Sequence, residues 1–469
     1  MLSLSSLAEG HLSIGIVIGR VRPRPGILAQ LALVAALVGS GSAACAQPIA
    51  HPLPSGVDLS QPVTLADCVR IAMAVNPQLA LADEAVRQAR AAVTETRAAQ
   101  LPNLQFQGDA GKQKLRGSGT SSGGSSPGTS PSTFSWGANL VLSQTLYQSG
   151  LFEQVGSAKA GERASRFGAT DARRTVVLNV AQSYYTAVAA KALVGVAARS
   201  LEASTRHIER AEARVEQGVA APADVYPFRV EIAQARLQVI TAETQFQNGL
   251  TSLKQVIGLP AQVPLQLADD FGRPELAEKV EDLLHAAYET RPDVLQQKAL
   301  VESARLNARV AEIQHGPVLD VSGNVAYGLD NDAAGTDGLV QAAVTFPVFD
   351  GGLTKAKADS ARSALRAARD TLQQLELAVS AQVESDYLTA VQANHSIDAA
   401  EAAVQAAEIS LKAAEGKYAE GVGTVIDVTD AQLKLTQSDS DRVQAYFTYN
   451  TALAALRAAI GRMAAPGAE

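Results

Sequence analysis

Aromatic residues and cysteines are scarce in this sequence. Phenylalanine, tryptophan and tyrosine make up only 4% of the 469 residues although 47% are hydrophobic, so much of the apolar content is alanine. Such small side chains suit helices packed closely side by side rather than a thick globular core. The two cysteines are too few for a framework of disulfide bonds.

Signals of catalysis, metal binding and nucleic-acid binding are also absent. The six histidines show no metal-ligand spacing. They are His11, His51, His207, His285, His315 and His395. The stretch Gly117–Ser132 is rich in glycine and serine but contains neither a nucleophile motif nor a phosphate-binding lysine motif. The net charge of −7 argues against a nucleic-acid partner. We therefore predict a protein that is not an enzyme and that needs no cofactor or metal.

Long hydrophobic runs are missing too. No apolar run beyond the N-terminal region reaches the ~18 residues that suggest a transmembrane helix. At the N-terminus, a cluster of arginines precedes the shorter apolar run Ile27–Val38, and Ala44-Cys45-Ala46 fits the small-x-small cleavage pattern. This order is typical of a secretory signal peptide. We predict a signal peptide over residues 1–46 and an exported protein.

The end of this signal peptide leaves one alternative open. Cys45 could carry a lipid anchor, although Ser42 stands where a lipoprotein signal usually has leucine. Cleavage after Ala46 would leave Cys68 as the only cysteine of the mature chain, so no intramolecular disulfide could form. We expect Cys68 to pack as a small apolar side chain.

Two very long alanine-rich stretches without internal proline dominate the rest of the chain, Leu151–Gln217 and Leu353–Glu420. Each spans about 67 residues, or roughly 100 Å of α-helix. The second has an apolar residue at every third or fourth position, at Leu372, Leu375, Val379, Val383, Tyr387 and Val391. Long helices of this kind pack against other helices, so we predict a bundle or coiled coil, with a filament or stalk as the alternative.

A pair of predicted strands precedes each long helix. Apolar and polar residues alternate over 103–115 and 134–147, which is the period of a strand with two different faces. The loop Gly117–Ser132 joins these strands into a hairpin. A second hairpin with a shorter loop is predicted over 317–328 and 339–348.

The whole order of elements occurs twice. Asn76-Pro77 corresponds to Arg291-Pro292 about 215 residues later, and beyond the second hairpin the offset falls to about 202. At that offset Ile257-Gly258 corresponds to Ile460-Gly461. Such a tandem duplication is the strongest signal in the sequence.

This duplication divides the chain into consecutive parts. We predict an extended leader over 47–63, a first structural repeat over 64–258, an inter-repeat linker over 259–277, a second structural repeat over 278–461 and a C-terminal tail over 462–469. In each repeat, the two shorter helices would lie end to end beside the long one.

The four predicted strands have the length and alternation of transmembrane β-strands. Four strands cannot close a barrel, because single-chain barrels start at eight strands, and open strand edges are not tolerated in lipid. If the hairpins lie in a membrane, several copies of the chain must therefore share one barrel. The alternative is a pair of soluble hairpins packed on the helices.

Two motifs resemble the outer-membrane efflux protein family typified by TolC, and the resemblance covers essentially all of the predicted mature chain. They are Thr64-Leu65-Ala66-Asp67 leading to Asn76-Pro77, and Tyr418-x-x-Gly421-x-x-Thr424-x-x-Asp427-Val428-x-x-Ala431. The resemblance implies a homotrimer with a twelve-stranded β-barrel in the lipid of the outer membrane and an α-helical barrel in the periplasm. The predicted fold class is thus mainly α with a small transmembrane β part, on a duplicated helix–β-hairpin–long helix plan.

The same resemblance implies a function. Members of the family work with a periplasmic adaptor protein and an inner-membrane efflux or ABC pump, in tripartite efflux or type I secretion systems. We predict a passive outer-membrane exit channel for small molecules or proteins. The alternative is an exported helical scaffold or adhesin without channel activity, whose hairpins mediate protein contacts.

Asp427 and Asp430 are the first candidate site residues. They begin the predicted helix after the turn Gly421–Thr424, and a spacing of three places them on one helix face. Acidic residues at a helix N-terminus can simply cap exposed amides and offset the helix dipole. The resemblance implies instead that they form carboxylate rings at the periplasmic entrance of a trimer, where they would favour cations.

Tyr418 and Asp224 are the second candidate pair. The resemblance implies that Tyr418, in the second repeat, bonds to Asp224 of the first repeat and helps to hold the entrance shut. An arginine completes this latch in the family, but Gly423 stands at its position here. Tyr418 could equally be an ordinary packed tyrosine.

Overall fold

The computed structural model describes residues 61–114, 132–268, 271–276, 279–330 and 333–462, all within one compact unit, Leu53–Glu469. The predicted signal peptide, Cys45, most of the predicted leader, the first hairpin loop and nearly all of the predicted tail lie outside these residues. Within the described ranges, no helix is both long and apolar enough to cross a membrane.

The start of the first repeat follows its capping residues. Helix α2 (Leu65–Val75) begins at Thr64, which forms a reciprocal capping box with Asp67. Asn76 ends α2 and caps α3 (Pro77–Ala98), because its Oδ1 accepts a hydrogen bond from the backbone N–H of Gln78 at 2.7 Å. The predicted helix start at Asn76-Pro77 is therefore present.

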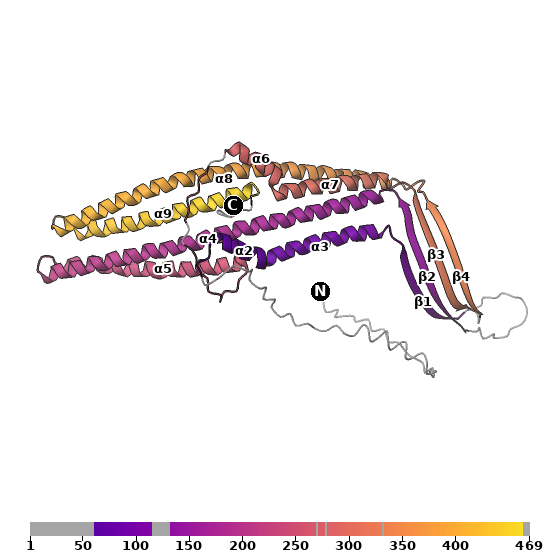
Figure 1. Cartoon of the computed structure of the whole chain (residues 1–469), viewed down its shortest axis with the longest axis horizontal. Helices are drawn as coiled ribbons and strands as arrows, with labels where there is room; N and C mark the ends of the chain where they lie inside the picture. The colour runs from indigo at the N-terminus through magenta and orange to yellow at the C-terminus, as the bar shows by residue number, and fades with distance from the viewer. Residues whose placement is uncertain (1–60, 115–131, 269–270, 277–278, 331–332, 463–469) are drawn as a thin grey trace, which may run out of the picture. The chain divides into compact units, whose positions relative to one another are not determined.

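The two long helices are α4 (Leu151–Glu216) and α8 (Leu353–Ala419), of 66 and 67 residues. Figure 1 shows the shorter helices lying along them: α3 and α5 (Val225–Ile257) pack on α4, whereas α7 (Pro292–Ile313) and α9 (Val425–Ala459) pack on α8. The predicted pairing of one long helix with two shorter ones is confirmed. Helix α4 also contacts α7 and α9 and so joins the two repeats.

Both long helices end in the same way. Gly218 and Gly421 follow them in the left-handed conformation, with φ of 74° and 75°. Glycine adopts this conformation at little cost, which lets the chain reverse directly after each helix. After Gly218 the sequence predicts a helix from Pro222 onwards. The structure instead has a 3₁₀ turn, η1 (Pro222–Asp224), before α5 begins.

Equivalent positions of the two repeats make equivalent contacts. The Asn76 amide donates to the carbonyl of Val256 at 2.7 Å, and the Arg291 guanidinium donates to the carbonyl of Ala459 at 2.9 Å. Each bond ties the start of α3 or α7 to the end of α5 or α9. Directly before Arg291 lies a further short helix, α6 (Val280–Thr290), which packs on α8 and corresponds to α2.

The largest buried cluster lies where α2 meets α4 and α5. Cys68, Tyr184, Leu253 and Ile257 are each at most 1% exposed there. Burial of each large apolar side chain contributes on the order of 2 kcal/mol, which holds the short helices on the long one. Cys68 packs as an apolar side chain, as predicted, and burial raises the pKa of its thiol to about 12.

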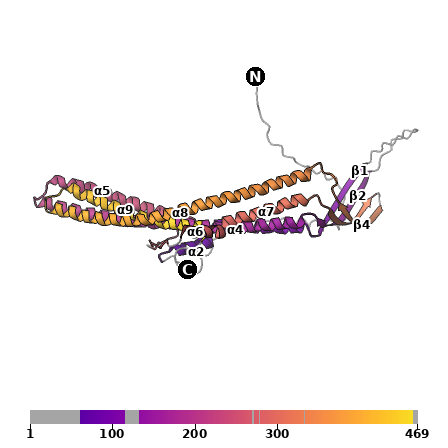
Figure 2. The same cartoon turned by 90° about the horizontal axis from the view of Figure 1, so that it is seen from above.

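The four strands form one antiparallel sheet in the order β1 (Asn103–Lys114), β2 (Ser132–Gln148), β3 (Val318–Asp330) and β4 (Ala333–Thr345). Each repeat supplies one hairpin, and the β2–β3 pair joins the two hairpins. Figure 2 shows the sheet following the ends of the long helices.

The register separates an apolar face from a polar one. One row across the four strands consists of Leu104, Leu142, Gly323 and Val340. The adjacent row, on the opposite face, consists of Asn103, Ser143, Ser322 and Gln341. Residues paired across strands share a face, so the alternation predicted from the sequence gives the whole sheet two distinct surfaces.

The strand ends differ from the predicted ones, most clearly in the second hairpin. The strand predicted over 339–348 runs from Ala333 to Thr345, and the residues of 333–338 expected in the loop pair with β3. The residues of this segment are small or polar, so no alternation of large apolar side chains indicated a strand there. The segment joins the sheet through its backbone groups. The strand ends before Pro347, which has no N–H to donate. Strand β2 likewise begins at Ser132, two residues before its predicted start at 134.

Candidate functional site

The predicted site residues lie on two turns that pack against each other. The turn between α4 and α5 and the turn between α8 and α9 are at the ends of the long helices away from the sheet (Figure 1). Val225 and Phe228 of α5 are buried together with Val425 and Val428 of α9 in a small apolar cluster. This cluster joins the first repeat to the second at the tip of the helices.

Asp427 makes capping contacts at the start of α9. Its carboxylate accepts hydrogen bonds from the backbone N–H of Thr424 at 2.8 Å and from the Thr424 hydroxyl at 2.7 Å. The Asp427 N–H donates back to that hydroxyl at 3.3 Å, which completes a capping box. The hydrogen bonds from Thr424 lower the pKa of Asp427, so the group is a carboxylate at neutral pH. The structure thus contains the capping contacts that the sequence offers as the alternative to a ring.

Asp430 lies one turn further along α9 and is exposed. Its side chain lines the mouth of a cavity between α5 and α9. Both aspartates are therefore solvent-accessible carboxylates at the tip, and the Thr424 hydrogen bonds fix the orientation of Asp427.

Tyr418 packs across the boundary between the repeats. Its ring and that of Phe228 pack edge to face with their centroids 6.0 Å apart, and the Arg214 guanidinium lies 5.0 Å from the Tyr418 centroid. Arg214 also donates to the carbonyl of Ala419 at 2.9 Å. A cation over an aromatic face is attracted by the ring's electrons, so Arg214 of α4 holds the end of α8.

Tyr418 and Asp224 are not hydrogen-bonded to each other. The Tyr418 hydroxyl is buried and finds no hydrogen-bond partner among the described residues. Burial raises the pKa of this hydroxyl, the Arg214 charge opposes the rise, and the Asp224 charge adds to it. The Asp224 charge acts on the Tyr418 hydroxyl, but no hydrogen bond joins the predicted pair.

Arg214 is a site residue that the sequence did not single out. At Gly423, where the family's arginine would stand, an added Cβ would lie 2.9 Å from Lys417 Cβ and 3.1 Å from the Lys417 carbonyl carbon. The tight turn thus leaves no room for a side chain unless Lys417 shifts. The cation that lies beside the Tyr418 ring is Arg214, in the last turn of α4 in the other repeat.

His207 is a second residue that sequence reasoning missed. It is only 4% exposed, with Nε2 at 2.9 Å from Glu415 of α8 and Nδ1 at 3.6 Å from Glu231 of α5. Burial lowers the pKa of His207, but the two carboxylates outweigh this effect and raise it overall. The histidine links three helices through partners far away in the sequence, so local spacing gave no signal.

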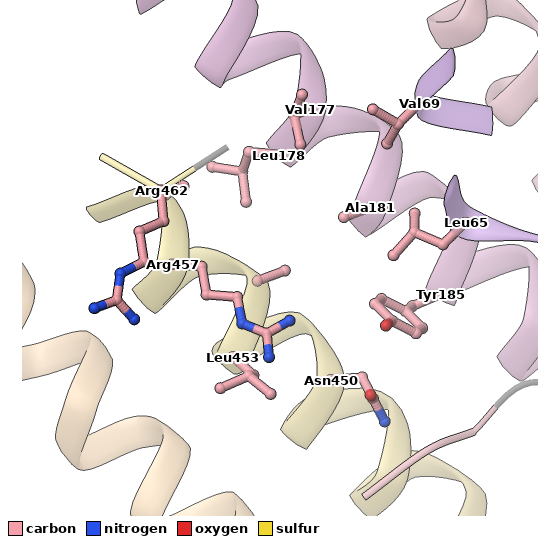
Figure 3. Close-up of a pocket in the computed structure, with 12 residues that line it drawn as sticks. Leu65, Val69, Val177, Leu178, Ala181, Tyr185, Asn450, Leu453, Arg457 and Arg462 are labelled. Atoms are coloured by element: carbon pink, nitrogen blue, oxygen red, sulfur yellow. The ribbon is translucent and has the colours of Figure 1, made fainter. Parts of the chain in front are cut away.

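The small cavity in Figure 3 lies between α2, α4 and α9, away from these turns. Leu65, Val69, Tyr185 and Leu453 are among the residues that line it, and its volume of about 30 Å³ is enough for little more than a water molecule. We do not regard it as a ligand site.

Comparisons with known proteins give one consistent result. The model of the family described as outer membrane efflux protein matches residues 69–259 and 283–462. The chain is 28% identical over 405 residues to the pyoverdine export outer membrane protein OpmQ of Pseudomonas putida, covering 84% of each chain. It is 25% identical over 338 residues to the outer membrane protein TolC of Vibrio cholerae, covering 70% of this chain and 76% of that one. The crystal structure of the CmeC outer membrane channel of Campylobacter jejuni matches its fold with a TM-score of 0.74 at 18% identity, covering 85% of each chain.

Proposed function

Because this chain belongs to the outer membrane efflux protein family, we propose that three copies assemble into one channel, in which each copy contributes four strands to a shared twelve-stranded barrel. The protein itself is an outer-membrane channel of the efflux and secretion class and is not an enzyme. The family is one of trimeric channels that serve tripartite systems.

The open sheet is the observation that carries the assembly proposal. Strands β1 and β4 are its two edges, and each pairs on one side only. Phe106 on β1 is 73% exposed and Val340 on β4 is 82% exposed, both on the apolar face. Unpaired edges beside exposed apolar side chains are unstable in water and in lipid, whereas pairing β4 of one copy with β1 of the next satisfies both edges.

We propose that the tip formed by the two packed turns is the periplasmic entrance. Asp427 and Asp430 of three copies would form two carboxylate rings there and attract cations. Tyr418, Asp224 and Arg214 would form the contact between repeats that keeps the entrance narrow, with Arg214 supplying the positive charge that Gly423 cannot.

The partners that we propose follow from the passive nature of the channel. No nucleotide-binding motif occurs in the sequence, so energy must come from elsewhere. We propose a periplasmic adaptor protein and an inner-membrane efflux or ABC pump as the partners. Because one relative is named for pyoverdine export, a small organic molecule is the first cargo to test, with proteins as the second class.

The molar mass of the protein extracted from outer membranes tests the assembly. Light scattering in detergent, corrected for bound detergent, is expected to give three copies of the chain. On heating in sodium dodecyl sulfate, the assembly should shift to the monomer position on a gel. A monomer in mild detergent, or a soluble monomer in the periplasm, would favour the scaffold alternative.

A further inference from the structure

A cavity with a mixed polar and apolar lining lies between α5 and α9, next to the two packed turns but separate from the contact of Tyr418 with Arg214. Its volume is about 310 Å³, which is within the range of small-molecule sites. Residues of α4, α5 and α9 line it, so both repeats contribute to its wall. We call it the α5–α9 cavity.

The polar groups of the α5–α9 cavity include buried acceptors that lack donors. Gln432 of α9 is 5% exposed, and its Oε1 has no hydrogen-bond partner in the described part of the chain. The amide Nε2 donates to the Thr436 hydroxyl at 3.3 Å. That hydroxyl lies within hydrogen-bonding distance of the Gln432 backbone carbonyl, at 3.0 Å, and of the Ser200 hydroxyl, at 3.1 Å. Oε1 is the end of the amide that remains for a ligand.

Glu231 of α5 supplies a second unpartnered acceptor and a negative charge. Its Oε1 accepts a hydrogen bond from the Ser204 hydroxyl at 2.7 Å and lies 3.6 Å from His207. Its Oε2 is buried without a partner among the described residues. A buried carboxylate oxygen without a donor is costly, and a bound cation would remove that cost.

The remaining lining of the cavity favours a particular type of cation. None of the residues that line it, all within the described ranges, is a lysine, arginine or histidine, and Asp430 adds a carboxylate at the mouth. Val230 and Leu433 supply apolar walls. In the described part of the chain, no group of three histidine, cysteine, aspartate or glutamate side chains could hold a metal ion. The site therefore lacks the ligands of a metal but suits a donor with an apolar body.

We propose that the α5–α9 cavity binds a linear alkylammonium ion, that is, a di- or polyamine. A primary ammonium has three N–H donors and no acceptor, which complements Gln432 Oε1 and Glu231 Oε2. Its methylene chain would lie against Val230 and Leu433.

The shape of the neighbouring surface supports a linear ligand. Gln238, Leu433 and Thr436 line both the α5–α9 cavity and a second hollow of about 310 Å³ further along the same helices. The second hollow has apolar and amide side chains and no charged residue in its lining. An alkyl chain held by its ammonium at Glu231 can extend into this hollow.

Isothermal titration of the purified trimer with spermidine tests the proposal. The titration is run in 150 mM NaCl at pH 8.5, where spermidine keeps most of its charge and His207 competes least for Glu231. Glu231→Gln removes the charge and is expected to weaken binding about tenfold or more. Gln432→Met keeps the side-chain size but removes the acceptor, and is expected to weaken binding severalfold.

Two variants serve as matched controls. Glu243→Gln makes the same change at an exposed position of α5 that does not line the cavity, and Asp441→Asn removes a charge from an exposed position of α9 that does not line it either. Both are expected to bind spermidine like the wild type. If Glu231→Gln does not form trimers, Gln432→Met decides the outcome.

Three results would overturn the proposal: no spermidine binding by the wild type, no loss in Gln432→Met, or an equal loss in either control. The last would mean general charge attraction. Channel conductance is measured separately, so failure here leaves the proposed assembly and entrance untouched.

Discussion

At the scale of single residues, the buried His207 couples the tip of the helices to pH. Glu231 of α5 and Glu415 of α8 face its ring, and Arg210 of α4 lies 3.4 Å from Glu415. The pKa of His207 is raised above its usual value by the two carboxylates despite burial. A raised pKa in the folded state means that protonation stabilises the fold.

The stability that His207 contributes is therefore complete below its unfolded pKa and is lost as pH rises through its folded pKa. We predict that the melting temperature falls as the pH rises above about 6.5, the ordinary pKa of histidine. In His207→Gln this fall should shrink, because glutamine keeps a hydrogen bond to Glu415 without titrating. Thermal unfolding, followed by circular dichroism at several pH values, gives the melting temperatures of the wild type and of His207→Gln. The same pH dependence in both proteins would assign the effect to other groups.

The contacts of Arg214 lead to a prediction about the two packed turns. Replacing Arg214 with alanine removes the contact with the Tyr418 ring and the bond to the Ala419 carbonyl, which together are worth on the order of 1–2 kcal/mol. Conductance should rise and fluctuate more because the two turns separate more often. Single-channel recording checks this expectation.

The control for Arg214 is Arg210→Ala, one helical turn earlier on α4, where the guanidinium is 61% exposed and lies 3.4 Å from Glu415. An exposed ion pair of this kind contributes little. Equal conductance changes in the two variants would show that Arg214 has no special part in the closed state.

The residue scale also shows where sequence reasoning reached its limit. Asp427 was found because its spacing from Thr424 is a local capping pattern as well as a family motif. Arg214 and His207 were not found, because their partners are distant in the sequence and meet them only after the repeats pack. Gly423 showed that the family's arginine is missing, but nothing in the sequence indicated that Arg214 would lie over the Tyr418 ring.

At the scale of elements, the capping box of α9 links the stability of that helix to the proposed entrance. Thr424→Ala removes the hydroxyl bonds with Asp427 and should cost about 1 kcal/mol. The first turn of α9 would fray, and the Asp427 carboxylate would lose its fixed position. We predict reduced cation selectivity with folded trimers retained.

Thr64→Ala is the matched control, because Thr64 and Asp67 form the same box at the start of α2, far from the two turns in the fold. It should lose similar stability and keep its selectivity. Ion selectivity from reversal potentials separates the two variants. If both lose selectivity equally, the effect is one of global stability.

Long elements were easier to predict than their ends. The helices α4 and α8 follow from uninterrupted, proline-free, alanine-rich sequence, and their ends follow from Gly218 and Gly421. The start of β4 did not follow, since the small residues of 333–338 pair through their backbone. Alternating apolar and polar side chains indicate a strand with one apolar face. Hydrogen bonding between two strands, in contrast, needs only backbone N–H and C=O groups.

At the scale of the whole molecule, the duplication determines how the parts meet. Asn76 and Arg291 bind the ends of α5 and α9 in the same way, so an offset read from the sequence translates into equivalent positions in space. The β2–β3 pair and the contacts of α4 with α7 and α9 then join the repeats. These long-range contacts depend on packing, and the sequence alone indicated only that the repeats exist.

The conductance of purified trimers in a planar bilayer tests the central claim most directly, with wild type compared with an Asp427→Asn/Asp430→Asn double variant. Asparagine keeps the side-chain size and hydrogen-bonding ability at the start of α9 while removing both charges. We predict small, cation-selective steps in the wild type and steps of lower selectivity in the variant. Folded trimers that conduct no ions would contradict the channel assembly, and unchanged selectivity in the variant would contradict the carboxylate entrance and leave Asp427 as a helix cap.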